Sequence, residues 1–162
     1  MNSNTEKTLP IPTVDVKFKI CNPLWETQEL AYSTPCSAGV DLRACFDEES
    51  VTIMPGQRLA IRTGLAIEIT APGIAGFVYS RSGLGTKEGL VVSQGVGVID
   101  PDYRGEIIVS LLNTSPEPRT VTRCQRIAQL VFQPVVQANI VFSQTLSETS
   151  RGGGGFGHTG KL

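Results

Sequence analysis

Apolar and polar residues alternate along much of the chain in short runs with a period of two. Between residues 14 and 20 every second position is apolar and the positions between are charged, which is typical of a strand with one buried face. Similar short β-like runs occupy residues 59–61, 65–69, 76–79, 107–112, 127–132 and 140–142. No segment keeps a helical period for more than about two turns. The pattern predicts an all-β protein.

Turn-forming residues separate these runs. Glycine and proline gather at residues 54–56, 71–73 and 115–118, and many short strands with such punctuation favour a β-barrel or jelly-roll-like fold. One short helix is predicted from Ser82 to Glu88, with Ser82 as its N-terminal cap. Its first amides would then lie beside Arg81 and form a natural place for an anion.

The length and composition indicate one domain with two less ordered ends. A chain of 162 residues is long enough for a substantial core. Residues 1–13 are expected to form a flexible lead-in and residues 14–142 the β-domain. Residues 143–162 are polar and then rich in glycine, so they should form a mobile arm that cannot bury enough apolar surface to order itself.

Charge and cysteine usage exclude several classes of protein. The formal net charge of −1 provides no basic field for direct nucleic-acid binding, so any phosphate must be bound by local groups. The four cysteines have no Cys-x-x-Cys spacing, which argues against a zinc site or a disulfide framework. No apolar run approaches a membrane span and the N-terminal residues are polar. We therefore expect a soluble cytoplasmic protein with free thiols and no membrane partner.

The stretch from Gly95 to Glu106 carries the most chemistry. Gly95 and Gly97 suit a hairpin whose own main-chain groups face a ligand. Pro101 fixes its own φ and holds Asp100 in an extended conformation at the mouth of the turn, and Tyr103 follows with a flat ring. A backbone-lined slot, a fixed carboxylate and a ring suit a small planar ligand. The glycines, the proline and the aspartate also fit an ordinary surface turn.

Five stretches, in order, resemble the motifs of the trimeric deoxyuridine triphosphatases (dUTPases). They are Ala-Gly-Val-Asp-Leu-Arg at 38–43, Ser-Arg-Ser-Gly-Leu-Gly at 80–85, the stretch at 95–106, Arg-Ile-Ala-Gln-Leu at 126–130, and Arg-Gly-Gly-Gly-Gly-Phe-Gly at 151–157. The resemblance covers nearly the whole chain. It implies a distorted jelly-roll-like β-barrel and hydrolysis of dUTP to dUMP and pyrophosphate, which limits uracil in DNA and supplies dUMP for thymidylate synthesis. It also implies a homotrimer in which three chains build each site.

The resemblance assigns the nucleoside to the stretch at 95–106. Asp100 would orient the attacking water and contact the sugar 3'-hydroxyl, or it could merely cap its own turn. Tyr103 would pack under the deoxyribose and exclude a 2'-hydroxyl, or it could be a half-buried strand tyrosine. Main-chain groups of Gly95, Val96, Gly97 and Val98 would read uracil. Gln94 stands near the place where part of the family uses an asparagine.

The phosphates would be bound by residues from two other motifs. Arg81, Ser82 and Gly83 match the family's phosphate-binding motif, and an arginine fork can bind two oxygens at once. Ser80 replaces a proline common in the family, which predicts a looser turn. Gln129 matches a further phosphate contact.

Two positions beside Gln129 stay open. Arg126 is as well explained as a brace at a subunit boundary. Cys124 stands where the family commonly has glycine, so either the turn is reshaped or Cys124 is strained.

The remaining assignments concern the metal and the C-terminal arm. One Mg²⁺ would be chelated by the three phosphates, with Asp41 hydrogen-bonded to a coordinated water; alternatively Asp41 is a turn carboxylate beside Arg43. Arg151 would bind the γ-phosphate. Phe156 would cover the uracil, and Gly157, His158 and Thr159 would close over the phosphates. A glycine-rich end can also be a plain linker.

Two rival functions remain. The same fold could support deamination of dCTP, although relatives of that kind usually lack a tyrosine at the position of Tyr103. A non-catalytic trimeric scaffold is the other, although such a protein would be expected to lose Asp100 or Arg151.

Overall fold

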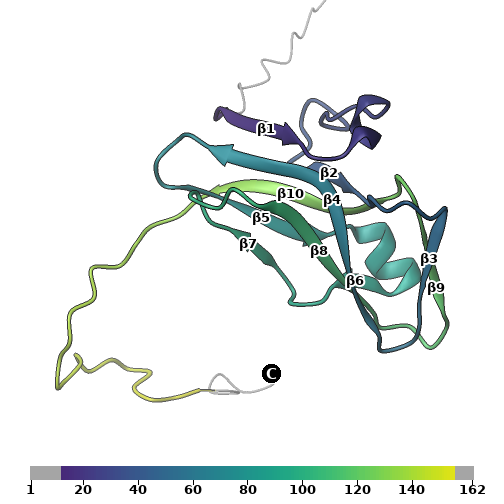
Figure 1. Ribbon diagram of the computed structural model, residues 1–162. Helices are drawn as coiled ribbons and strands as arrows, with labels where there is room; N and C mark the ends of the chain where they lie inside the picture. The colour runs from purple at the N-terminus through teal and green to yellow at the C-terminus, as the bar shows by residue number, and fades with distance from the viewer. Residues whose placement is uncertain (1–11, 156–162) are drawn as a thin grey trace, which may run out of the picture.

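The structure is a computed structural model that describes residues 12–155, and its regular elements are almost entirely strands (Figure 1). The all-β prediction is confirmed. In chain order the elements are β1 (Val16–Ile20), η1 (Pro23–Glu26), β2 (Val40–Arg43), β3 (Ser50–Ile53), β4 (Arg58–Ile69), β5 (Ile74–Ser80), η2 (Leu84–Glu88), β6 (Leu90–Val92), β7 (Gly97–Ile99), β8 (Glu106–Asn113), β9 (Arg119–Thr122) and β10 (Arg126–Pro134).

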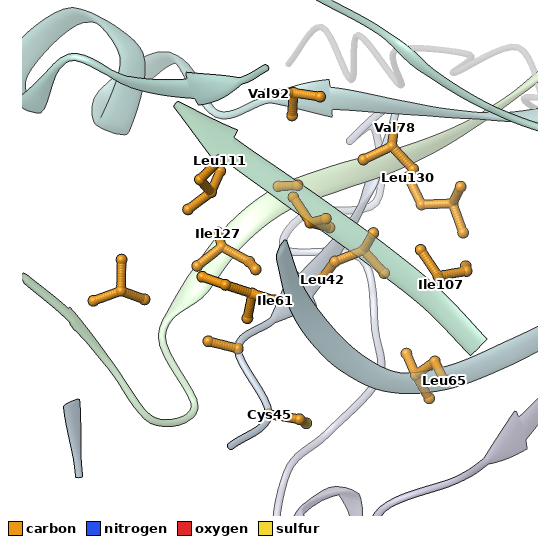
Figure 2. Close-up of a cluster of buried hydrophobic side chains, with 14 of the residues drawn as sticks. Leu42, Cys45, Ile61, Leu65, Val78, Val92, Ile107, Leu111, Ile127 and Leu130 are labelled. Atoms are coloured by element: carbon orange, nitrogen blue, oxygen red, sulfur yellow. The ribbon is translucent and has the colours of Figure 1, made fainter. Parts of the chain in front are cut away.

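Two four-stranded sheets and one two-stranded sheet make up the fold. The strand orders are β1-β4-β8-β6, β2-β10-β5-β7 and β3-β9, and every pairing between them is antiparallel. The core lies between the two larger sheets: Figure 2 shows Leu65 and Leu111 from one sheet sharing a space with Leu42 and Leu130 from the other. Burial of each such side chain contributes about 1.5–3 kcal/mol to folding.

Strand β4 bends at Gly64. Its φ of +69° favours glycine, and a Cβ there would lie 2.8 Å from Asn22 Cβ and 2.9 Å from Cys45 Sγ. The pairing with β8 shifts register between Arg62 and Ala66 at the same place. The separate runs predicted at 59–61 and 65–69 are therefore one continuous strand with a bulge.

Several predicted elements need correction. The run at 140–142 forms no strand, and its Ile140 and Phe142 are 76% and 95% exposed. After β10 the chain leaves the sheets and runs away from them (Figure 1). Five strands had no predicted counterpart; each has only three or four residues, too few to display a period: β2, β3, β6, β7 and β9.

The predicted helix at Ser82 to Glu88 exists but is wound differently. It is π-helical over Leu84–Glu88 and ends at Gly89, whose φ is +70°. Gly83 is its N-cap and no side chain caps it, so the assignment of Ser82 as the cap is wrong. The 3₁₀ turn at Pro23–Glu26 was not predicted; Asn22 caps it through a hydrogen bond from the Leu24 amide.

Candidate active site

A small cavity opens between strands β7 and β8, which belong to different sheets. In the described part of the chain, β7 is an edge strand that pairs with β5 alone, whereas β8 pairs with β4 and β6. The stretch from Gly95 to Glu106 is therefore not a hydrogen-bonded hairpin, which corrects the prediction. The cavity has a volume of about 240 Å³. Its lining residues are Val78, Val92, Gln94, Gly97, Val98, Ile99, Asp100, Tyr103, Ile107, Ile108 and Val109.

Gly95 and Gly97 are required in this stretch for different structural reasons. Gly95 has a φ of +80°, its amide donates to the Val92 carbonyl at 3.0 Å, and a Cβ there would meet open space. Gly97 is buried in β7, where a Cβ would lie 3.2 Å from Val78 Cβ and 3.4 Å from Gln94 Nε2. Gly95 thus makes the turn and Gly97 allows the edge strand to pack closely.

Asp100 begins the turn that follows β7. The Tyr103 amide donates to the Asp100 carbonyl at 3.0 Å, and Arg104 Nη1 donates to the Pro101 carbonyl at 2.7 Å and to the Tyr103 carbonyl at 3.0 Å. The turn is held by main chain and by Arg104. Within residues 12–155 no hydrogen bond or ion pair engages the Asp100 carboxylate, which is exposed at the cavity. It is therefore not a turn cap, and it can accept a proton from a water.

Tyr103 lies in the loop between β7 and β8, so it is not a strand tyrosine. Its side chain lines the cavity and the residue is 42% exposed. The hydroxyl donates to the Glu106 carbonyl at 3.0 Å, which folds the ring back toward the start of β8. One face of the ring is thus available at the mouth of the cavity.

A second cavity, of about 430 Å³, gathers the predicted phosphate ligands. Arg81, Ser82, Gly83, Gln129 and Asp41 line it together with residues from the segment 33–39. These side chains come from β2, β10 and the segment after β5, so the fold brings three motifs together that lie far apart in the sequence.

Asp41 is held between two arginines in this cavity. Arg81 Nε lies 2.7 Å from Asp41 Oδ1, and Arg126 Nη1 lies 3.0 Å from Asp41 Oδ2. The alternative partner, Arg43, instead donates to the Cys124 carbonyl at 2.9 Å, so that alternative is wrong. Paired guanidinium groups at one carboxylate leave a positively charged wall that suits an anion.

Ser80 fixes the turn that precedes the phosphate motif, and the prediction of a looser turn is wrong. Its hydroxyl accepts a hydrogen bond from the Val92 amide at 2.8 Å, and its carbonyl accepts one from Gln129 Nε2 at 3.0 Å. Ser80 thereby joins the end of β5 to β6 and holds Gln129 at the phosphate cavity.

Cys124 is strained. Its φ of +67° is the only positive value at a non-glycine position in the described part of the chain. The Cys124 amide donates to the Ala44 carbonyl at 2.9 Å, and its carbonyl accepts from Arg43. These bonds hold Cys124 in the left-handed conformation, which a glycine would adopt without steric strain.

The predicted site residues lie in two different cavities and on the C-terminal arm. The cavity at β7 and the phosphate cavity share no lining residue. Arg151 is exposed on the C-terminal arm, where its Nε donates to the Gly154 carbonyl at 2.9 Å. Phe156, Gly157, His158 and Thr159 lie outside the described residues.

The apolar walls of the cavity at β7 were not predicted. Val78 comes from β5 and Ile107 and Val109 from β8, and all three are also core residues of ordinary strands. No local pattern separates a strand residue that faces a ligand from one that faces the core, so only the sheet topology identifies them.

The cysteines and the membrane prediction have separate outcomes. All four cysteines are free thiols, as predicted, and burial raises the pKa of the Cys45 thiol to about 11. Among residues 12–155 there is no cluster of three metal-ligating side chains. No helix in the same part of the chain is long and apolar enough to cross a membrane.

Comparisons with known proteins fix the family. The family model described as dUTPase matches residues 26–160. The chain belongs to the dUTPase family. A deoxyuridine 5'-triphosphate nucleotidohydrolase of Desulfitobacterium hafniense is 54% identical over 129 residues, which cover 80% of this chain and 85% of that protein. The protein of the same name from Pseudomonas aeruginosa strain LESB58 is 53% identical, with the same coverage.

Solved structures of the family share the fold. A mutant dUTPase of Staphylococcus bacteriophage 80alpha, with dUpNHpp, has a TM-score of 0.78 and 23% identity over 91% of this chain and 99% of that one. A mutant dUTPase of phage phi11 of S. aureus, described with a structural Mg(II) ion, has a TM-score of 0.71 and 19% identity over 83% and 99% of the two chains. At these identities the likeness concerns the fold.

Proposed function

We propose that the chain hydrolyses dUTP to dUMP and pyrophosphate, which limits uracil incorporation into DNA and supplies dUMP for thymidylate synthesis. The observation that carries the proposal is the cavity at the free edge of β7, with Asp100 and Tyr103 at its mouth. Membership of the dUTPase family agrees with it, and so do the close relatives named deoxyuridine 5'-triphosphate nucleotidohydrolase.

The base would bind along the edge of β7. The main-chain groups on that edge have no strand partner among residues 12–155, and an edge strand offers alternating donors and acceptors in fixed positions. We propose that these groups from Gly95 to Val98 read uracil, with Gln94 beside them. Tyr103 would pack under the deoxyribose and leave no room for a 2'-hydroxyl, so discrimination against UTP would be steric.

The triphosphate would bind in the cavity of Arg81, Ser82, Gly83 and Gln129. The Arg81 guanidinium now pairs with Asp41, and its remaining donors can reach phosphate oxygens at the same time. Phosphate binding would therefore not leave Asp41 without a partner, since Arg126 also bonds it.

Hydrolysis would proceed by in-line attack of a water on the α-phosphorus. Asp100 would accept the water proton as the oxygen–phosphorus bond forms. The bond from the α-phosphorus to the bridging oxygen would break, and pyrophosphate would leave with the electron pair. Charge that develops on the phosphates would be balanced by Arg81 and by Arg151 from the C-terminal arm.

The residues of the phosphate cavity fit Mg²⁺ only as a substrate-bound ion. Asp41 is the one carboxylate among the described residues that lines this cavity, and it is already bonded to two arginines. Mg²⁺ often binds through one or two carboxylates together with substrate phosphates and waters. We propose that Asp41 acts through a water, and that the ion supplies charge neutralisation on the phosphates.

We further propose a homotrimer with three shared sites. Two observations support this: Asp100 and Arg81 line different cavities, and the arm that carries Arg151 runs away from the sheets (Figure 1). In this arrangement residues 143–162 act as a mobile arm that closes a site, residues 14–142 form the β-domain and residues 1–13 a flexible lead-in. The free cysteines agree with a cytoplasmic location.

The deciding experiment incubates the purified chain and Mg²⁺ with dUTP, dTTP, dCTP or UTP and measures pyrophosphate and ammonia. Pyrophosphate from dUTP alone is the expected result. Ammonia from dCTP would favour the deaminase, and no product from any nucleotide would favour the scaffold. Sedimentation of the active species tests the trimer, and a fully active monomer would contradict it.

A further inference from the structure

We infer that Gly105 and Glu106 are positioning residues for Tyr103 and thereby set the discrimination between dUTP and UTP. This inference rests on the proposed function, since it concerns the sugar that the same cavity would accept. Neither residue lines the cavity; both would act through the tyrosine ring.

Gly105 leaves the space that the Tyr103 ring occupies. A Cβ at this position would lie 2.6 Å from Tyr103 Cζ and 3.0 Å from Tyr103 Cε2, and closer still to the hydroxyl oxygen. Real Cβ atoms do not approach other atoms so closely, so any side chain here must displace the ring. The φ of Gly105 is not in the left-handed region, which means that the absent side chain is needed for space and not for backbone conformation.

Glu106 holds the hydroxyl end of the Tyr103 side chain. Its main-chain carbonyl accepts the Tyr103 hydroxyl at 3.0 Å, and its carboxylate binds the bulge in β4. Oε1 accepts from the Gly64 amide at 2.7 Å, and Oε2 pairs with Arg62. The Glu106 side chain is 11% exposed, although its partner Arg62 is 70% exposed. Its two bonds, one of them to a main-chain amide, hold residue 106 in place.

The two contacts together leave the ring one position. Gly105 lets the ring lie flat against the main chain, and the Glu106 carbonyl holds the hydroxyl there. A ring free to move outward would open space beneath the sugar, where the 2'-hydroxyl of a ribonucleotide could enter. Gly105 and Glu106 therefore set the selectivity for the deoxy sugar, and the β4 bulge holds Glu106 in position.

The test compares kcat/KM for dUTP and for UTP in the full-length Gly105→Ala variant. Because both substrates are measured on one preparation, the ratio does not depend on the fraction of folded protein. The expected result is a loss of dUTP-over-UTP selectivity of about 10-fold or more, mainly through a higher kcat/KM for UTP. The Tyr103 side chain is partly exposed and can swing outward, so this variant should fold.

Control variants separate positioning from general damage. Gly56→Ala strains a turn with a φ of +74° outside both cavities, and it should lower stability while leaving selectivity unchanged. Glu106→Ala should relax selectivity like Gly105→Ala. Glu106→Gln keeps an acceptor for the Gly64 amide and should restore most of it, while Glu68→Gln, at the exposed pair with Lys17, should have no effect.

The outcomes distinguish this inference from the proposed function. A wild-type chain that leaves dUTP uncleaved would overturn both. A wild-type chain that prefers dUTP, with unchanged selectivity in both Gly105→Ala and Glu106→Ala, would overturn the positioning role alone. Equal loss of selectivity in Gly56→Ala would also overturn it, because the effect would then arise without any change next to Tyr103.

Discussion

The Asp100→Asn substitution separates the chemical step from folding and binding. The Asp100 carboxylate is exposed beside the cavity at β7, and no hydrogen bond or ion pair within residues 12–155 uses it. Replacing it with an amide of the same size removes no native contact. The free energy of unfolding should therefore change by less than about 0.5 kcal/mol.

The loss of turnover should be large. A general base accelerates a reaction by roughly 10²- to 10⁴-fold, which corresponds to about 2.7–5.4 kcal/mol of activation free energy. The amide oxygen can still accept a hydrogen bond from the sugar or from water, but it cannot take a proton. We expect kcat to fall by this factor while the affinity for a non-hydrolysable dUTP analogue stays near that of the wild type.

The assay is the initial rate of pyrophosphate release over a range of dUTP concentrations, with calorimetric binding of the analogue beside it. Asp102→Asn is the matched control, since Asp102 lies in the same turn and is exposed but does not line the cavity. It should keep wild-type kcat. Turnover of Asp100→Asn within about tenfold of the wild type, or an equal loss in Asp102→Asn, would remove Asp100 from its role.

Four further predictions concern the phosphate cavity, the metal, the arm and the strained turn. Arg81→Ala should lower kcat/KM for dUTP by about 10²- to 10³-fold, and a change below tenfold would contradict phosphate binding by Arg81. Chelation with EDTA should stop turnover without lowering the melting temperature, because the described residues form no metal cluster. Deletion of residues 151–162 should largely abolish turnover and leave the melting temperature unchanged. Cys124→Gly should stabilise the fold by about 0.5–1 kcal/mol, as relief of left-handed strain exceeds the added chain entropy; a lower denaturation midpoint would refute this.

The strands that the sequence predicted are those long enough to display their period. Strands β1, β8 and β10 have five to nine residues, and a half-buried strand of that length alternates visibly. Strands β6 and β7 have three residues each, and tertiary pairing alone defines them. The run at 140–142 shows the converse, since apolar residues with β propensity form no strand where no neighbouring strand lies beside them.

The cavity-lining residues that the sequence singled out are those whose residue type carries chemistry, and the lining residues that it missed depend on sheet topology. The residue types alone identify the carboxylate of Asp100 and the guanidinium of Arg81. The position of β7 and β8 in different sheets, with a cavity between them, cannot be recognised in this way, because pairing between strands far apart in the sequence has no local signal. The partners of Asp41 were missed for the same reason, since Arg81 and Arg126 lie on other elements.

An exposed sheet edge is usually a liability, since its free main-chain groups can pair with another chain. Here β7 is only three residues long, and its outer edge faces the cavity beside β8. Recognition through such an edge, as proposed here, would not depend on the side chains of Val96 and Val98, so most substitutions at these two positions would alter it little. It depends on where the main chain and the Tyr103 ring lie, and Gly97 and Gly105 fix both by leaving room. We therefore expect changes at Asp100 and Arg81 to alter rate, and changes at these two glycines to alter which nucleotide is accepted.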